Sequence, residues 1–96
     1  MNILITYDVD TTEREGQKRL RQVAKACTDY GQRVQNSVFE CEVTDVQLVV
    51  LKDRLKSIIN MGFDSIRIYH LNKNEKRRVE VIGIETSFNV NETIII

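Results

Sequence analysis

The chain has 96 residues, of which 42% are hydrophobic and 29% are charged, and its 14 acidic and 14 basic residues cancel. This length suits a single domain over residues 1–96, and a chain of this size buries only about 60–65% of its unfolded surface. No stretch approaches the roughly 20 apolar residues of a membrane span, and no signal-peptide pattern precedes the first strand. We therefore expect a cytoplasmic protein without a membrane partner, and the net charge alone favours no ligand.

The first predicted element is a strand over residues 2–9. The run Ile3-Leu4-Ile5-Thr6-Tyr7 is almost continuously β-forming, and Asp8 follows it where the strand meets a loop. Acidic side chains are rarely held against apolar surroundings without a partner, and a cation is one such partner. We therefore expect Asp8 to suit a metal-binding or catalytic acid. An aspartate at this place also forms Asx turns, and the sequence leaves both interpretations open.

A helix over about residues 13–30 is predicted next. It begins after Asp10-Thr11-Thr12 with acids in its first turn, and Gly31 ends it. Its apolar residues have the i, i+3, i+4, i+7 spacing of one buried face. These residues are Leu20, Val23, Ala24 and Cys27. Asp10 is interpreted as a cap of this helix, with a ligand position beside Asp8 as the alternative.

The middle of the chain predicts one strand and a second helix. Residues 33–43 are rich in β-branched and aromatic side chains, which favours a strand that is bent or bulged near Asn36-Ser37. Thr44 and Asp45 are suited to cap a helix over residues 45–61. The apolar residues of that helix recur at helical spacing. They are Leu48, Leu51, Leu55, Ile58 and Ile59.

Two further strands are predicted over residues 64–71 and 79–84, with a polar turn between them. We interpret the chain as an α+β, ferredoxin-like β-α-β-β-α-β domain with one antiparallel sheet and two helices. A short apolar run at residues 93–96 is left over. Because exposed sheet edges accept an added strand, we expect this C-terminal strand to be exchanged with the partner subunit in a homodimer.

Basic residues gather in two places despite the neutral total. Four of them recur on the first helix within an arc of roughly 60° that lies away from its apolar residues. These are Arg14, Lys18, Arg21 and Lys25. A second group precedes the last predicted strand and consists of Lys73, Lys76, Arg77 and Arg78. Both groups suit contacts with the phosphates of duplex DNA or RNA, and the alternative is an ordinary solvated surface.

The remaining reactive side chains support no second chemistry. Cys27 and Cys41 have no neighbouring ligand at metal-site spacing, so we predict buried, reduced thiols. His70 is the only histidine and is expected to be structural or exposed instead of a ligand or general base. The four glycines stand singly, which excludes a glycine-rich phosphate loop.

Asp8 is the residue to which hydrolytic chemistry is best assigned. A carboxylate-bound Mg²⁺, or another divalent cation such as Mn²⁺, supplies the activated water and the charge neutralisation that phosphodiester hydrolysis needs. One carboxylate is a small ligand set, but Mg²⁺ keeps several waters and accepts one or two protein carboxylates. Two copies of Asp8 meeting across a dimer axis would suffice, so the hypothesis makes dimerisation part of the site.

Two sequence blocks together resemble the CRISPR-associated Cas-two family. They are Ile5-Thr6-Tyr7-Asp8-Val9 and the run YGQRVQNSVFE from Tyr30 to Glu40. The resemblance extends over essentially the whole chain, and it implies a ferredoxin-like homodimer in which each C-terminal strand adds to the partner's sheet. It also implies metal-dependent nuclease activity on RNA or double-stranded DNA, and a role as the central subunit of the complex with the Cas-one integrase that inserts spacers for antiviral defence.

The resemblance also implies site residues. The family's metal-binding acid falls on Asp8, and the other implicated positions map to Tyr7, Arg19, Arg33 and Phe39. Arg19 lies off the basic arc by periodicity, so Lys18 or Arg21 is an alternative for the helical position. Phe39 is equally explained by packing of its own strand.

Two functions are favoured for this one fold, and a small-ligand-binding regulatory domain is the third alternative that the fold alone allows. The first is a Mg²⁺-dependent endonuclease in which paired Asp8 carboxylates hold the ion, while Arg19 or Arg33 stabilises phosphate charge. The second is a non-catalytic adaptor that binds duplex backbone through the basic helix and the residues around 73–78, and holds the integrase through its sheet edges and tail.

Overall fold

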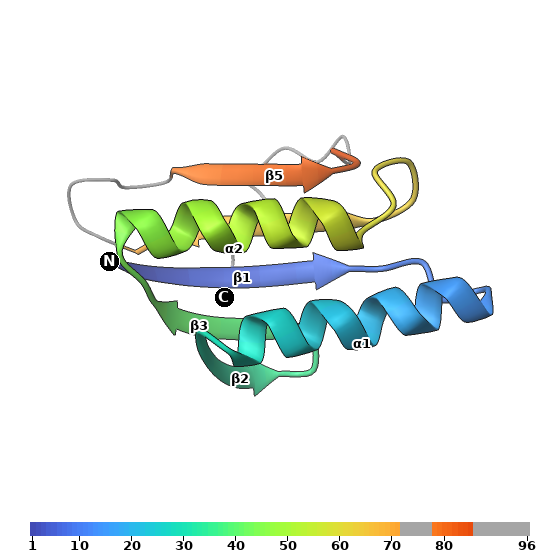
Figure 1. Ribbon diagram of the computed structural model, residues 1–96, viewed down its shortest axis with the longest axis horizontal. Helices are drawn as coiled ribbons and strands as arrows, with labels where there is room; N and C mark the ends of the chain where they lie inside the picture. Colours follow the sequence, from blue (N-terminus) through green and yellow to red (C-terminus); the bar gives the residue numbers. More distant parts are fainter. Residues whose placement is uncertain (72–77, 86–96) are drawn as a thin grey trace.

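Seven helices and strands make up the described part of the chain, which is residues 1–71 and 78–85 of a computed structural model. In chain order they are β1 (Asn2–Asp8), α1 (Arg14–Thr28), β2 (Gly31–Gln35), β3 (Val38–Glu42), α2 (Asp45–Ile58), β4 (Ser65–His70) and β5 (Val79–Gly83). The five strands form one sheet in the order β2-β3-β1-β4-β5, and both helices cover the same face of it (Figure 1). No helix in these two ranges is long and apolar enough to cross a membrane.

β1 is the central strand and pairs antiparallel with β3 on one side and β4 on the other. Side chains alternate between the two faces of a strand. Ile3, Ile5 and Tyr7 are buried beneath the helices, and the residues between them belong to the opposite face, which we call the open face. The open face carries Leu4, Thr6 and Asp8 from β1.

The predicted ferredoxin-like fold is confirmed. α1 connects β1 to β2, and α2 connects β3 to β4, so that two β-α-β units interleave in one antiparallel sheet. The predicted strand at residues 79–84, which we counted within the β-α-β-β-α-β core, is instead an additional edge strand: that core is complete at β4, and β5 pairs with β4 outside it. The expected C-terminal strand at residues 93–96 lies outside the described residues, as do Lys73, Lys76 and Arg77.

The prediction of one bent strand over residues 33–43 is wrong. This segment contributes to two antiparallel strands, β2 and β3, with a tight turn at Asn36-Ser37 between them. The register shifts between Arg33 and Gln35, which lies ahead of Asn36-Ser37, where the sequence pattern suggested a bend or bulge. A turn of Asn and Ser lacks the glycine that marks most two-residue hairpins, so the two strands resemble one continuous run.

The two helices begin differently. α2 starts with a capping box, because the side chains of Thr44 and Gln47 each bond the other residue's backbone N–H. α1 begins with Glu13 at the N-cap, whose side chain makes no capping hydrogen bond. Asp10 instead accepts hydrogen bonds from the backbone N–H and the hydroxyl of Thr12. The predicted capping role of Asp10 is therefore wrong, and it stabilises a turn ahead of the helix.

The core lies between the helices and the sheet. Leu51 and Leu55 of α2, Val23 of α1 and Ile66 and Ile68 of β4 are completely buried. Cys27 and Cys41 are also buried, as predicted. Burial raises the pKa of Cys27 to about 12 and that of Cys41 to about 11, so both thiols stay protonated at neutral pH.

Leu51→Ala tests this packing. Truncation of a fully buried leucine leaves a cavity, and we expect the free energy of unfolding to fall by about 2–5 kcal/mol in urea titrations. Val50→Ala is the matched control, because the neighbouring side chain on α2 is 50% exposed and its change should stay within about 0.5 kcal/mol. Equal losses for the two variants would contradict the assignment of the buried face.

Candidate functional site

Asp8 is the last residue of β1 and is exposed on the open face, opposite Ser65 of β4. Its place at the end of the strand agrees with the prediction, but its side chain is exposed instead of held against apolar surroundings. Among the described residues, no side chain or backbone N–H donates a hydrogen bond to this carboxylate. Asp8 is thus neither a buried acid nor an Asx-turn residue, and no residue in the described ranges occupies its oxygens.

Tyr7 points to the opposite side of the sheet from Asp8, beneath the helices. Its ring stacks with that of Phe39 at a centroid distance of 6.1 Å, and the guanidinium of Arg33 lies 5.2 Å from the Phe39 ring. The Tyr7 hydroxyl donates to the carbonyl oxygen of Asn36 at 3.2 Å. Burial raises the pKa of Tyr7, with Arg33 acting in the opposite sense, so the phenol is neutral at physiological pH.

The structure therefore divides the residues that the family resemblance grouped together. Tyr7, Phe39 and Arg33 form one cluster on the helix side of the sheet, whereas Asp8 lies on the other face. Arg19 belongs to neither place. These positions are consistent with packing roles for Tyr7 and Phe39.

Arg19 forms an ion pair with Asp64, a residue to which the sequence analysis assigned no role. The Nε of Arg19 lies 2.7 Å from Oδ2 of Asp64, and its Nη2 lies 3.3 Å from Oδ1. The backbone N–H groups of Asp10 and Asn60 donate to the same carboxylate at 3.0 and 2.9 Å. Asp64 is completely buried, yet each of its oxygens accepts two hydrogen bonds.

These donors decide the charge of Asp64. Burial alone would raise its pKa, but the hydrogen bonds from Arg19, Asn60 and Asp10 outweigh burial, and the pKa lies below the ordinary value of 3.8. The carboxylate is therefore ionised at neutral pH, and its partner Arg19 is charged. Arg19 is mostly buried too, since only 18% of its side chain is exposed.

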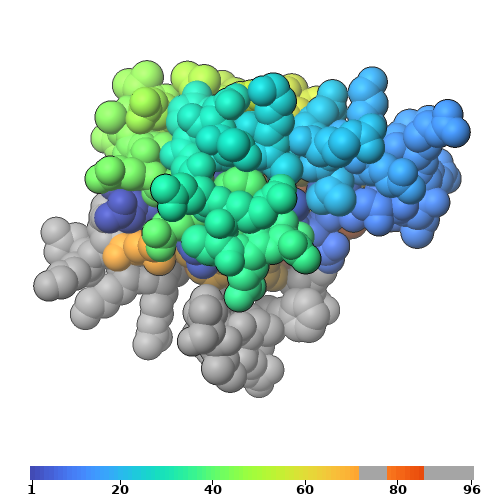
Figure 2. All heavy atoms as spheres, turned by 90° about the horizontal axis from the view of Figure 1, so that it is seen from below, coloured from blue at the N-terminus to red at the C-terminus, as the bar shows by residue number. Residues whose placement is uncertain are grey.

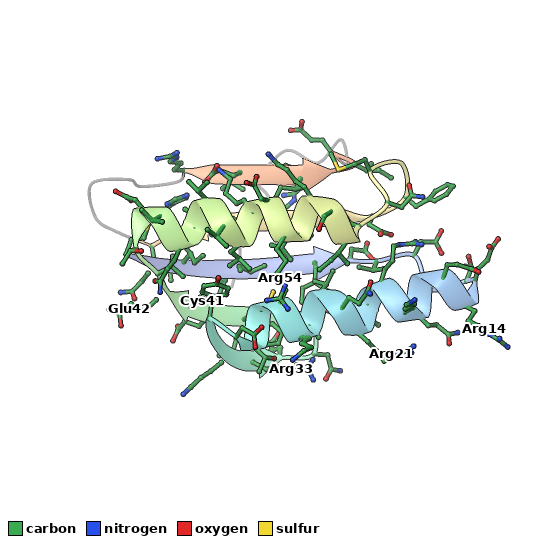
Figure 3. The ribbon with its side chains drawn as sticks, in the orientation of Figure 1. Arg14, Arg21, Arg33, Cys41, Glu42 and Arg54 are labelled. Atoms are coloured by element: carbon green, nitrogen blue, oxygen red, sulfur yellow. The ribbon has the colours of Figure 1, made fainter. Side chains whose placement is uncertain are left out.

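The four basic residues predicted on the first helix form an exposed row on α1, which we call the basic row: Arg14, Lys18, Arg21 and Lys25. None of them forms an ion pair with another residue of the described ranges. Figure 3 shows Arg14 and Arg21 projecting from α1 away from α2, with Arg33 on the same side. In Figure 2 the atoms of α1 make up much of the surface of the helix layer on this side. Arg78 is exposed beside β5.

Arg67 is a basic residue of the open face that sequence reasoning missed. It pairs with Thr6, two positions from the Asp8–Ser65 pair, and shares the face of Asp8. Of the arginines and lysines in the described strands, Arg67 alone lies on this face. The alternation of Ile66 and Ile68 with Arg67 indicated that Arg67 faces away from the core. Only the register with β1 shows that Arg67 is close to Asp8.

His70 is buried and structural, which the sequence analysis favoured over a ligand role. Its Nε2 lies 2.6 Å from Oε2 of Glu80, whose other oxygen pairs with Lys52 of α2. Burial raises the pKa of Glu80, but the bonds from Lys52 and His70 outweigh this and lower it overall. The triad ties α2 to β4 and β5.

A single chain does not assemble a closed metal site within residues 1–71 and 78–85. No group of three or more His, Cys, Asp or Glu side chains lies close enough there to hold an ion. Asp8 contributes one exposed carboxylate, a donor type that Mg²⁺ prefers, and leaves the other positions to water or a second chain. Asp8 therefore does not by itself define a metal site in the described part of the chain.

The strand order and the position of Asp8 on the open face define the class of the protein. It is a ferredoxin-like domain with an exposed acid at the end of its central strand. The family model described as CRISPR associated protein Cas2 matches residues 1–79. The chain is 53% identical over 94 residues to "CRISPR-associated endoribonuclease Cas2 3" of Rhodospirillum rubrum, covering 98% of this chain and 99% of the relative. It is 55% identical over 95 residues to "CRISPR-associated endonuclease Cas2" of Halalkalibacterium halodurans, covering 99% of each chain.

The solved structures agree. The crystal structure of Cas2 from Streptococcus pyogenes at pH 6.5 superposes with a TM-score of 0.72 and 60% identity, covering 86% of this chain and 100% of that one. The chain therefore belongs to the Cas2 family of CRISPR-associated proteins.

The ionised state of Asp64 predicts a pH dependence of stability. A carboxyl group whose pKa is lowered by folding stabilises the folded state above its ordinary pKa, and this contribution is lost as the pH falls. We expect Asp64→Asn to lower the free energy of unfolding by about 3 kcal/mol at pH 7. The difference from wild type should narrow as the pH is taken below 3.8, the ordinary value for this group.

Urea titrations between pH 7 and pH 3 measure this difference. Asp53→Asn, at an exposed position of α2, is the control and should change stability by less than about 0.5 kcal/mol at every pH. An Asp64→Asn difference that stays constant across this range would show that the charge of Asp64 does not contribute to stability.

Proposed function

We propose that this protein is a metal-dependent endonuclease that hydrolyses phosphodiester bonds of RNA or double-stranded DNA in CRISPR spacer acquisition. The single observation that carries the proposal is Asp8, an exposed carboxylate at the end of the central strand that accepts no hydrogen bond from residues 1–71 or 78–85. The names of the relatives support the class of reaction, since one is called an endoribonuclease and another an endonuclease.

The proposed ligand of Asp8 is Mg²⁺ or Mn²⁺. A hard divalent cation accepts carboxylate oxygens and keeps several waters, so one acid from each of two chains is a sufficient protein ligand set. When bound, such an ion activates a water for attack and neutralises charge on the phosphate. The chain's own contribution is to hold the carboxylate at the rigid end of the central strand, where β1 is paired with β4.

A second copy of this chain is the proposed partner on the open face. Leu4, Val38 and Val81 are half-buried there, and in the described ranges no helix covers them. Apolar surface of this kind gains from burial against another subunit, and a two-fold axis would bring the two copies of Asp8 together. The homodimer therefore completes the ligand set that one chain lacks.

Arg67 is the residue that we assign to the phosphate on this face. A guanidinium forms short, charge-assisted hydrogen bonds to phosphate oxygens. Two residues that lie diagonally across paired strands, two positions apart, are about 7–8 Å from each other. Arg67 and Asp8 have this relation, so their separation is within the span of one nucleotide. Arg33 and Arg19 both lie on the helix side of the sheet, away from the face of Asp8, so neither is as well placed.

Asp8→Asn tests the endonuclease assignment. The amide keeps the shape of the side chain but removes the charge that attracts a divalent cation, so we expect cleavage to fall by about 10²–10³-fold. The assay compares matched RNA and duplex DNA substrates with and without Mg²⁺ or Mn²⁺. The substrate class follows from which of them wild-type protein cuts.

Asp53→Asn is the matched control, because it changes another exposed aspartate to asparagine on the helix side of the molecule. Its cleavage should equal that of wild type. Persistent cleavage by Asp8→Asn, or cleavage that survives removal of metal by a chelator, would rule out the proposed site.

A second candidate function is a non-catalytic adaptor that binds duplex DNA for a Cas-one integrase. The observation that favours it is the exposure of the basic row along α1, without ion pairs to other described residues. This row lies on the helix side, away from Asp8, and therefore does not depend on the hydrolytic site. Phosphate contacts from such a row are independent of sequence and weaken as salt rises.

Charge reversal of Lys18 and Arg21 tests the adaptor function. Each lost phosphate contact lowers the slope of log affinity against log salt by about 0.9, so the double variant should lose about 1.8 from that slope. Duplex binding is measured by fluorescence anisotropy over a series of salt concentrations. Lys56→Glu, at an exposed position of α2, is the control and should leave the slope unchanged. An unchanged slope in the double variant would remove the basic row from the duplex interface.

A further inference from the structure

Asp64 is a charged residue in a place where charge is expensive. Among the described residues, only Asp64 and His70 are buried polar side chains, and the rest of the core is apolar. An ionised carboxylate in such surroundings is stable only when it is paired and fully hydrogen-bonded. Asp64 meets this condition with four hydrogen bonds, two of which come from the guanidinium of Arg19.

The bonds of Asp64 join the segments that continue the two paired strands beyond Asp8. Asp64 immediately precedes Ser65, the register partner of Asp8, and it accepts a hydrogen bond from the backbone N–H of Asp10, two residues after Asp8. Its own carbonyl oxygen accepts from the N–H of Ile84 at the end of β5. The ends of strands fray unless further hydrogen bonds hold them together. Here the hydrogen bonds of Asp64 lie directly beyond the candidate acid, Asp8.

Arg19 adds hydrogen bonds from α1 to this group of contacts around Asp64. Its Nη2 also lies 3.5 Å from the carbonyl oxygen of Asp10, so one guanidinium contacts both the carboxylate and the loop. α1 approaches this loop closely, because a Cβ added at Gly16 would stand 1.8 Å from the Asp10 carbonyl oxygen. Figure 1 shows the β1–α1 loop and the α2–β4 connection at the same end of the sheet.

The surroundings of Arg19 are unsuited to a phosphate. Arg19 borders a surface hollow that Asp10, Glu13 and Glu15 also line. The charges of Asp64, Asp10 and Glu15 all raise the pKa of Arg19, which shows how strongly acidic its neighbourhood is. A nucleic-acid phosphate entering this hollow would meet three carboxylates and a guanidinium already bonded to a fourth.

We infer that Asp64 and Arg19 are a positioning pair that holds Asp8 in place, and that Arg19 acts through Asp64 instead of contacting the nucleic acid. The inference rests on the proposed function, because it takes Asp8 as the metal-binding acid. It gives Asp64 a role in the site and reassigns Arg19. A lysine cannot replace Arg19, since one ammonium cannot bond both carboxylate oxygens and the Asp10 carbonyl in the same fork.

Arg19→Lys and Asp64→Asn, singly and together, test the inference in the intact protein. Each single variant should raise the Mg²⁺ concentration for half-maximal cleavage by about tenfold, as substitutions behind metal ligands commonly do. KM for the nucleic acid should stay unchanged, because neither residue touches it. The double variant should resemble the single ones, because both substitutions break the same contact.

Arg54→Lys and Asp29→Asn are the matched controls. Arg54 and Asp29 form an ion pair between the helices at 2.7 Å, but both side chains are more than a third exposed. The Mg²⁺ requirement of these controls should equal that of wild type. If Arg19→Lys leaves the Mg²⁺ requirement unchanged, or if it raises KM on the Asp64→Asn background, Arg19 is not a positioning residue.

A second measurement separates failure of this inference from failure of the endonuclease proposal. Amide hydrogen exchange of Asp10 is measured without metal or nucleic acid, and Arg19→Lys should accelerate it by about tenfold while Ile5 at the centre of β1 is unaffected. If wild type does not cleave, the endonuclease proposal fails, and the exchange of Asp10 still decides whether the pair holds the strand end. Unchanged Asp10 exchange in Arg19→Lys overturns the inference even where wild type cleaves.

Discussion

The central position of β1 determines which side chains can work together in this protein. β1 is hydrogen-bonded along both edges, so its register cannot slip by one residue without breaking two ladders and turning its buried side chains to solvent. Under this constraint Tyr7 must enter the core and Asp8 must leave it. Two residues that are adjacent in the sequence are separated by the thickness of the sheet, and a mechanism that requires contact between them is excluded in one chain.

Asp64 and Asp8, which lie near the same end of the sheet, show how burial determines what a carboxylate can bind. Asp64 is removed from water, and the free energy lost in desolvation is offset by four directed hydrogen bonds. Those bonds consume its oxygens, so Asp64 cannot bind a cation. Asp8 is solvated and has no such partners among the described residues. Of the two acids, the exposed one is therefore the candidate for binding a ligand, and the oxygens of the buried one are used within the fold.

Periodicity was sufficient to predict the helices and most strands, because their apolar spacing directly reflects which face is buried. Thr44 was found for the same kind of reason, since a capping box is local in sequence. The β2–β3 hairpin was missed where its Asn36-Ser37 turn carries no glycine. The Arg19–Asp64 pair was beyond local reasoning, because its two residues are 45 positions apart and an aspartate before a strand looks like an ordinary turn residue.

Residue roles drawn from family resemblance stay predictions, and the structure adds the location of each residue. The family resemblance grouped four residues with Asp8, namely Tyr7, Arg19, Arg33 and Phe39. In the structure these four contact residues other than Asp8. A residue whose loss lowers activity can belong to the hydrophobic core, to a pair that positions another residue, or to the functional site itself. Sequence motifs do not distinguish these three cases. Burial and hydrogen-bond partners do distinguish them.

Both candidate functions are compatible within one assembly because they use opposite sides of the sheet. Packing two open faces together would bring a single exposed acid from each chain to the axis, so that one residue supplies both carboxylates of the proposed site. The same packing leaves α1 on the outside, because the helices cover the other face. The basic row then faces solvent in both subunits and can contact duplex phosphates whether or not the acids at the axis cleave anything. Loss of Asp8 should therefore remove hydrolysis without removing nucleic-acid affinity, and loss of the basic row should do the reverse.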